Sequence, residues 1–203
     1  MKLRSVTAAK STAAALVLAV VGLSACTTKV GLAASIDGKH VTESTVSGYL
    51  TPKAQAVSQQ DSNGATTTTP ARSFVVSTII YERLFEVILN RLPRNDRLSA
   101  AQLNAEIKRE LAGHSSTEVA QSRGVTGYST SFNDLLVRES VINNILGTLN
   151  QSSDVVTQAI RGLKFPVDLS ARYGTWDPKT YSLNSTTYAG YPTFLKIPNT
   201  PKS

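Results

Sequence analysis

Few side chains in this 203-residue chain are suited to chemistry, since it holds one cysteine and two histidines. One cysteine excludes an internal disulfide, and together with two histidines it cannot complete an ordinary four-ligand zinc site. His40 and His114 belong to no HExxH, GxSxG, GxGxxG or phosphate-loop motif, and we expect them to face solvent or cap a helix. The sequence therefore predicts a protein that is not an enzyme and uses neither a metal nor a cofactor.

Carboxylates at helical spacing are the next candidates for acid–base chemistry. Glu82 and Glu86 are four residues apart, so on a helix they share one face. Neighbouring charges favour a solvated helix surface over a catalytic pair. Asp134, Arg138 and Glu139 are interpreted in the same way, as ion pairs on the surface of a later helix.

The segment before Cys26 gives that cysteine a different chemistry. Three cations, the last of them Lys10, precede an uninterrupted apolar run over residues 12–23, with no acidic residue between. A run of this length is shorter than the roughly 20 residues that cross a bilayer core as a helix. Residues 1–25 are therefore predicted to be a signal peptide.

Leu23-Ser24-Ala25-Cys26 resembles the lipobox of bacterial lipoproteins. The resemblance implies that Leu23, Ser24 and Ala25 meet the signal peptidase and that the Cys26 thiol carries a diacylglyceryl group. Each buried methylene contributes about 0.8 kcal/mol, so two or three acyl chains would hold the protein on the membrane. Alternatively, Cys26 is an ordinary small apolar residue near an unlipidated cleavage site or in an uncleaved anchor.

The charge of the chain is consistent with an envelope location. Its formal net charge is +7, and loss of the three leader cations lowers it to +4. A translocated protein does not meet nucleic acid, so the remaining charge is expected to serve acidic lipid or envelope polymer. The predicted location is the extracytoplasmic face of the bacterial cell membrane, with the lipid bilayer as partner through acylated Cys26.

The mature chain begins with a tether over residues 26–32 and a short hairpin. Residues 33–41 form two extended arms around an Asp-Gly pair, which tolerates a tight turn, and Thr42 is placed to cap a short helix. Residues 51–72 are rich in Gln, Ser, Thr, Asn, Gly and Pro. This composition predicts a solvated linker or a flexible loop.

Helical periodicity dominates the middle of the chain. Apolar residues recur at three- and four-residue steps from Ser73 until Pro93 forbids continuation. Capping boxes at Ser99/Gln102 and Ser115/Glu118 start two further helices. The remaining predicted helices are a longer one capped by Ser131 and a short one over residues 153–161.

Alternating apolar and polar residues predict a strand near the end of the domain. The alternation begins at Val167 and is expected to run on through residues 173–177, followed by an irregular tail over 178–203. A strand near each end and helices between them predict a mostly α fold. In it, the N- and C-terminal strands of a domain spanning residues 33–177 pair into a small β-sheet.

The order of these elements resembles the SurA N-terminal-like chaperone domain. The resemblance is carried by Ala-x-Ile-x-Gly-x-x-Val-Thr at 34–42, a long helix at 75–90, a capped Leu-x-x-x-Ile-x-x-x-Leu helix, and Val-Arg-x-x-Val-Ile at 137–142. Residues 172–177 resemble the closing strand of lipoproteins with that domain. The resemblance implies a helical chaperone, similar to part of SurA and PrsA-type foldases, that binds unfolded secreted polypeptides.

One departure from that group concerns catalysis. Those foldases usually carry a parvulin prolyl isomerase domain before the closing strand, where this chain has only residues 162–169. The expected function is therefore that of a non-catalytic chaperone. The alternative is an envelope scaffold or interaction lipoprotein that binds one defined partner.

Tyr173 and Trp176 are the aromatic residues nearest to the predicted closing strand. They could line a client-binding cleft, or they could fill the end of the helical core beneath that strand. We favour the core interpretation, because burying one large aromatic side chain contributes several kcal/mol and the chain has few aromatic residues.

Overall fold

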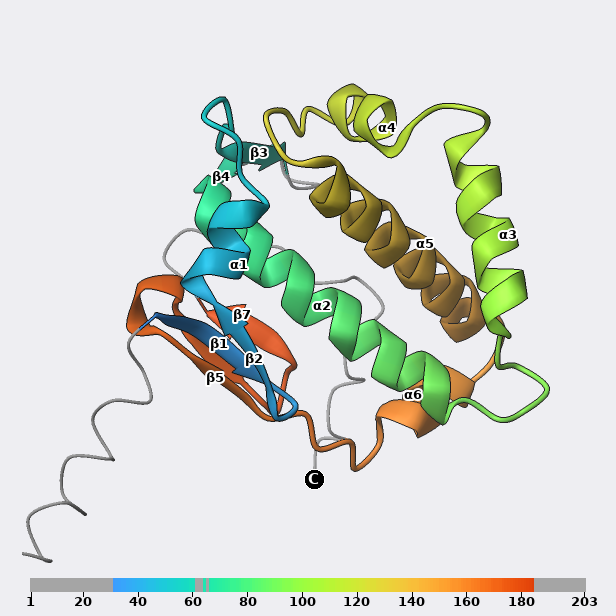
Figure 1. Cartoon of the computed structure of the whole chain (residues 1–203). Coiled ribbons are helices and arrows are strands. Elements are labelled where there is room, and N and C mark those ends of the chain that lie inside the picture. Colours follow the sequence, from blue (N-terminus) through green and yellow to red (C-terminus); the bar gives the residue numbers. More distant parts are fainter. Residues whose placement is uncertain (1–30, 61–63, 65, 185–203) are drawn as a thin grey trace, which may run out of the picture. The chain divides into compact units, whose positions relative to one another are not determined.

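The computed structural model describes residues 31–60, 64 and 66–184 (Figure 1). A compact unit begins at Gly31. Cys26, the residues 23–25 before it and residues 185–203 of the predicted tail lie outside the described residues. Helices predominate in the described part, and the strands form small sheets.

The helices begin and end at residues with clear local causes. Thr42 accepts a hydrogen bond from the N–H of Thr45, and both predicted capping boxes are present. The helix predicted to be capped by Ser131 is capped two residues earlier, by Ser129. The helices are α1 (Glu43–Gly48), α2 (Ala71–Arg91), α3 (Ala100–Leu111), α4 (Ser116–Ser122), α5 (Thr130–Ser152), α6 (Val155–Ile160) and the 3₁₀ helix η1 (Ala171–Tyr173).

Strands near the two ends of the domain pair as predicted. The hairpin of β1 (Leu32–Ile36) and β2 (Lys39–Thr42) is joined on the other side of β1 by β5 (Val167–Leu169), which runs antiparallel. Within this pairing Ser35 faces Asp168 across the two strands. The sheet order β2-β1-β5 therefore brings residues from both ends of the domain together.

The core is built around α2. Figure 1 shows the β2-β1-β5 sheet on one side of this helix and α5 on the other, with α3 and α4 beyond α5. Residues throughout α2 are buried, including Ile80, Leu84 and Phe85. Because α2 is covered on two sides, its apolar residues extend beyond a single stripe.

The prediction of a solvated linker or flexible loop over residues 51–72 is wrong where this segment forms strands and the start of α2. Its polar residues form an antiparallel hairpin of β3 (Val57–Gln60) and β4 (Thr66–Thr69), and α2 starts at Ala71. β-Branched threonines favour strands. Pairing of β3 with β4 satisfies the backbone N–H and C=O groups of this segment, so it forms a hairpin despite its low apolar content.

The segment before this hairpin is held against the start of α5. The N–H of Thr51 donates to the carbonyl of Gly127 at 3.0 Å, and the Tyr128 hydroxyl donates to the carbonyl of Gln55 at 2.7 Å. Gly127 has φ +82°, and a Cβ there would clash with the backbone of Lys53. This close approach requires glycine.

The prediction for the C-terminal strand is partly wrong. After β5 the chain turns through η1, and β6 (Thr175–Asp177) pairs with β7 (Ser182–Asn184) as a separate antiparallel hairpin. Tyr181, Ser182 and Leu183 are buried, so this part of the predicted irregular tail belongs to the folded unit. Gly174 adopts φ +99°, which breaks the extended run that the alternation predicted.

None of the helices in the described part of the chain combines the length and apolar character needed to cross a membrane.

Candidate functional site

An apolar groove lies beside Trp176, where β6 passes next to β5. Its volume is about 410 Å³. Pro166, Val167 and Pro178 supply further apolar lining, and Ser35 and Asp168, which are cross-strand partners, make part of its polar border. Trp176 is the one residue of this groove that was named from the sequence as a candidate site residue.

Trp176 is both a core residue and a lining residue. It is half-buried, and its ring lies 6.0 Å from Phe165, 6.3 Å from Tyr81 and 6.5 Å from Tyr181, measured between ring centroids. Its indole Nε1 is buried and has no hydrogen-bond partner among the described residues. Packing against aromatic neighbours therefore positions the ring, as the core interpretation predicted, while its role in client binding stays a prediction.

Tyr173 is a core residue, as favoured from the sequence, because only 2% of its surface is exposed. Its hydroxyl donates to Oε2 of Glu43 at 2.8 Å, and Arg72 Nη2 donates to the same oxygen at 2.8 Å. Arg172 Nη1 lies 3.5 Å from the other oxygen, Oε1. We call Glu43, Arg72, Arg172 and Tyr173 the terminal clamp, because it joins the start of α1, the start of α2 and η1.

The terminal clamp favours the charged form of its carboxylate. Burial alone would raise the pKa of Glu43, but the hydrogen bonds from Arg72 and Tyr173 and the charges of Arg172 and Arg72 hold that pKa below its ordinary value. The sequence placed Glu43 in the first turn of a helix, but it did not reveal partners 29 and 130 residues away.

The carboxylates interpreted as a solvated face are in contact with another helix, so that prediction is wrong for Glu82. Only 8% of Glu82 is exposed, and Arg138 from α5 donates to it from Nε at 2.9 Å. Arg138 also donates from Nη2 to Glu86 at 2.8 Å. Arg138 was predicted to pair on the surface of its own helix, whereas it joins α5 to α2.

Glu139, next to Arg138 along α5, completes what we call the interhelix layer with Glu82, Glu86 and Arg138. Burial raises the pKa of Glu139 to about 7, and the charge of Glu82 adds to this rise while Arg123 opposes it. Burial likewise raises the pKa of Glu82, against the hydrogen bond from Arg138. The layer thus joins two glutamates that share the Arg138 guanidinium with a third, Glu139, whose carboxyl group is buried near Glu82.

A second, more polar pocket of about 360 Å³ lies between the 51–55 segment and α4. Asn133 is buried beside it and donates from Nδ2 to Thr117 Oγ1 at 3.1 Å. Its Oδ1 has no hydrogen-bond partner among the described residues and is itself sealed from solvent. A ligand in this pocket could not reach that atom without a rearrangement, so we assign the pocket no role.

Both histidines are exposed, as expected. Within residues 31–60, 64 and 66–184, no three His, Cys, Asp or Glu side chains gather closely enough to hold a metal ion. Cys26, the predicted lipid attachment residue, lies outside these ranges.

Comparison of the chain with protein-family models, with curated proteins and with solved structures finds no match. The resemblance to the SurA N-terminal-like domain therefore stays a prediction.

Proposed function

We propose that this protein is a membrane-anchored extracytoplasmic lipoprotein that binds unfolded or partly folded secreted proteins as a non-catalytic chaperone. The observation that carries the proposal is the apolar groove beside Trp176. Exposed apolar side chains of a client would leave water by packing on Trp176 and the two prolines of the groove. Such burial is non-directional, so it does not depend on one client sequence.

The size of the groove fits weak and reversible binding. Its volume of about 410 Å³ lies near the lower end of the roughly 300–1,000 Å³ of ligand pockets, which leaves space for one or two side chains. Burial of about 100 Å² of apolar surface contributes about 2.5 kcal/mol. A chaperone needs such modest affinity, because its clients must leave in order to fold.

The finer description of the fold belongs to the same proposal. The helix order and the antiparallel pairing of β1 with β5 support a SurA N-terminal-like domain closed by its terminal strands. The shortness of the chain between α6 and β5 supports function without an isomerase domain.

The anchor is tested by metabolic labelling with a palmitate analogue. We expect label on the wild-type chain and none on Cys26→Ala, together with release of Cys26→Ala from the membrane fraction. Label that survives Cys26→Ala, or an unlabelled wild-type chain with its leader intact in the cytosol, would contradict the proposed anchor.

Client binding is tested with the leaderless chain, residues 27–203, and a denatured model protein that aggregates on dilution. We expect suppression of light scattering at stoichiometric ratios and its loss in Trp176→Ala. Tyr49→Ala is the matched control, because Tyr49 is also a half-buried aromatic residue packed on the core but lies outside the groove. Absence of suppression across several clients, or equal loss in both variants, would refute the groove as the client site.

Binding can also be followed directly, because Trp176 is the single tryptophan of the chain. An apolar peptide in the groove should shift its emission to shorter wavelength, and a Ser-substituted peptide should not. Crosslinking in intact cells then distinguishes the two predicted roles. Many captured secreted proteins support a chaperone, and one dominant partner would instead indicate a scaffold.

A further inference from the structure

We infer that the surface at the C-terminal end of α2 binds anionic lipid headgroups, which would give the anchored protein a second contact with the bilayer. We call this surface the basic end. It consists of five exposed cations from the end of α2, the loop that follows it and the segment after α6, namely Arg91, Arg94, Arg97, Arg161 and Lys164.

One hydrogen bond joins the two segments of the basic end, and another folds the first segment back on α2. Arg91 is the last residue of α2, and its Nη2 donates to the carbonyl of Arg161 at 3.4 Å. Arg97 folds back on the end of α2, where its Nη2 donates to the carbonyl of Leu92 at 3.0 Å. Arg94 lies between these two residues in the chain. The basic end is thus one continuous surface assembled from segments about 70 residues apart.

The charge of the basic end is little compensated. None of its five cations forms an ion pair with a described residue, whereas Arg72, Arg123 and Arg138 are paired with carboxylates elsewhere in the fold. One acidic residue, Asp96, lies in the same loop, and another, Asp154, precedes α6. A surface with this excess attracts anions through the summed field of its charges.

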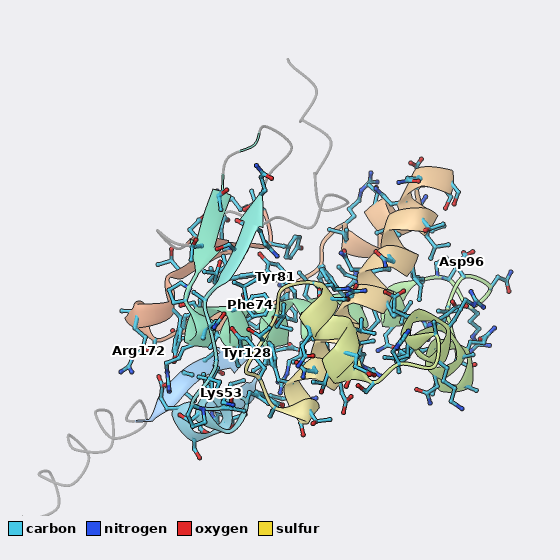
Figure 2. All side chains as sticks on the ribbon, turned by 90° about the horizontal axis from the view of Figure 1, so that it is seen from above. Lys53, Phe74, Tyr81, Asp96, Tyr128 and Arg172 are labelled. Atoms are coloured by element: carbon cyan, nitrogen blue, oxygen red, sulfur yellow. The ribbon has the colours of Figure 1, made fainter. Side chains whose placement is uncertain are left out.

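The basic end lies far from the point where the proposed tether enters the fold. The carbonyl of Gly31 accepts a hydrogen bond from the N–H of Glu43, and Glu43 contacts Arg72 at the start of α2. From Arg72 to Arg91 the helix rises about 29 Å. Figure 2 agrees, because Asp96 of the basic-end loop and Arg172 of the terminal clamp appear at opposite ends of the molecule.

This separation gives the basic end a function that the anchor alone does not provide. If Cys26 is lipidated, only four residues separate it from Gly31, so Gly31, near the clamp end of α2, is held within about 18 Å of Cys26. The basic end is then confined near the headgroups at high effective concentration. Binding at both ends would lay α2 along the bilayer. The inference relies on the proposed anchor for this confinement, but not on client binding.

The test uses the leaderless chain and vesicles, so that acyl chains play no part. The vesicles contain either phosphatidylcholine alone or equal parts of phosphatidylcholine and phosphatidylglycerol. We expect cosedimentation with the anionic vesicles only, decreasing steeply as salt is added. Equal binding to both vesicles, or none to either, would overturn the inference.

Two variants of equal net charge locate the surface. R91Q/R94Q/R161Q/K164Q should weaken binding by at least about tenfold. K39Q/K53Q/K108Q/K179Q removes the same number of exposed cations from other surfaces and should weaken it by less than about threefold. Equal weakening in both would show that net charge alone is responsible.

Two further controls keep the result interpretable. R94Q/R161Q/K164Q retains the hydrogen bond from Arg91 and serves if the fourfold variant melts at a lower temperature. A soluble polyanion should compete less well than vesicles at equal charge, and stronger binding to the polymer would overturn the assignment to lipid. Failure of these tests leaves palmitate labelling and aggregation suppression unaffected, so the two proposals can fail separately.

Discussion

The terminal clamp and the interhelix layer both join glutamates to neighbouring elements at α2, and they favour opposite protonation states. In the clamp, two arginines and a tyrosine hydroxyl surround the single carboxylate of Glu43. In the layer, Arg138 bridges Glu82 and Glu86, whereas burial and the charge of Glu82 act on Glu139 against the charge of Arg123. The pKa of Glu43 is lowered, whereas the pKa of Glu139 is raised to about 7.

The hydrogen bonds and cations that act on each carboxyl group account for this difference. Burial disfavours the charged form in both regions, so burial alone would raise both pKa values. Only the clamp supplies enough charged donors to reverse that effect. Acidification from pH 7 to pH 4 should therefore increase the contribution of the layer to the free energy of unfolding. Further acidification should decrease the contribution of the clamp.

The largest expected effect comes from removing the bridge of the layer. Arg138→Ala leaves Glu82, which is only 8% exposed, without its ion-pair partner. We expect the free energy of unfolding at pH 7 to fall by about 3 kcal/mol, measured by urea denaturation. Arg109→Ala removes an exposed ion pair and should cost less than about 0.5 kcal/mol. Equal losses in the two variants would show that burial of the Glu82–Arg138 ion pair adds nothing to its effect on the free energy of unfolding.

Removing the carboxyl group of Glu139, whose pKa is raised, should have the next largest effect on the free energy of unfolding, with the opposite sign. The folded-state pKa of Glu139, about 7, exceeds its unfolded value of about 4.5, so the native state binds the extra proton between these values. Its ionisation reduces stability as pH rises through that window. Glu139→Gln should therefore stabilise the protein at pH 8 by about 2 kcal/mol and change little at pH 4.

Chemical denaturation at the two pH values measures this difference. Asp134→Asn is the matched control, because Asp134 is an exposed carboxylate on the same helix. It should show no comparable gain at pH 8. If Glu139→Gln destabilises at both pH values, the carboxyl group is making a favourable ionised contact and the account of the layer is wrong.

The clamp should respond to pH in the other direction. Tyr173→Phe removes the hydroxyl that donates to Glu43 and should reduce the free energy of unfolding at pH 7 by about 1 kcal/mol. Because the folded-state pKa of Glu43 is lowered, this contribution is present above pH 4.5 and is lost as pH falls through the folded-state pKa.

Tyr181→Phe provides the comparison for that prediction. The Tyr181 hydroxyl donates to the carbonyl of Leu163 at 2.6 Å, an acceptor that does not titrate. Its loss should cost a similar free energy at every acidic pH. Parallel pH profiles for the two tyrosine variants would show that Glu43 does not titrate as the clamp requires.

The features that could be predicted from the sequence have local causes. The capping boxes at Ser99 and Ser115 involve residues three apart, and Pro93 ends α2 through its own ring. The edge-to-edge pairing of β1 with β5 was also predicted, because an extended segment at each end of a helical domain has few other partners.

The features that were missed depend on distant residues. Arg138 is 52 and 56 residues from its two partners in the chain. The sequence near Arg138 therefore indicated only a charged residue on an exposed helix surface. The β3–β4 hairpin was missed because its stability comes from cross-strand hydrogen bonds and one buried end at Val57 and Thr69, which composition does not reveal. The Trp176 groove likewise needs β6 to lie beside β5.

The smallest expected effect separates contact from long-range charge within the clamp. Arg172 lies 3.5 Å from Glu43 Oε1 and its side chain is 65% exposed, whereas Arg72 donates a hydrogen bond at 2.8 Å. Arg172→Gln should change the free energy of unfolding by less than about 0.5 kcal/mol and raise the pKa of Glu43 slightly. NMR titration of the Glu43 side chain measures that pKa. Arg72→Gln should raise that pKa more, because it also removes a hydrogen bond. If the two variants raise it equally, charge alone sets the protonation of the clamp, and the contrast with the interhelix layer becomes one of net charge instead of hydrogen bonding.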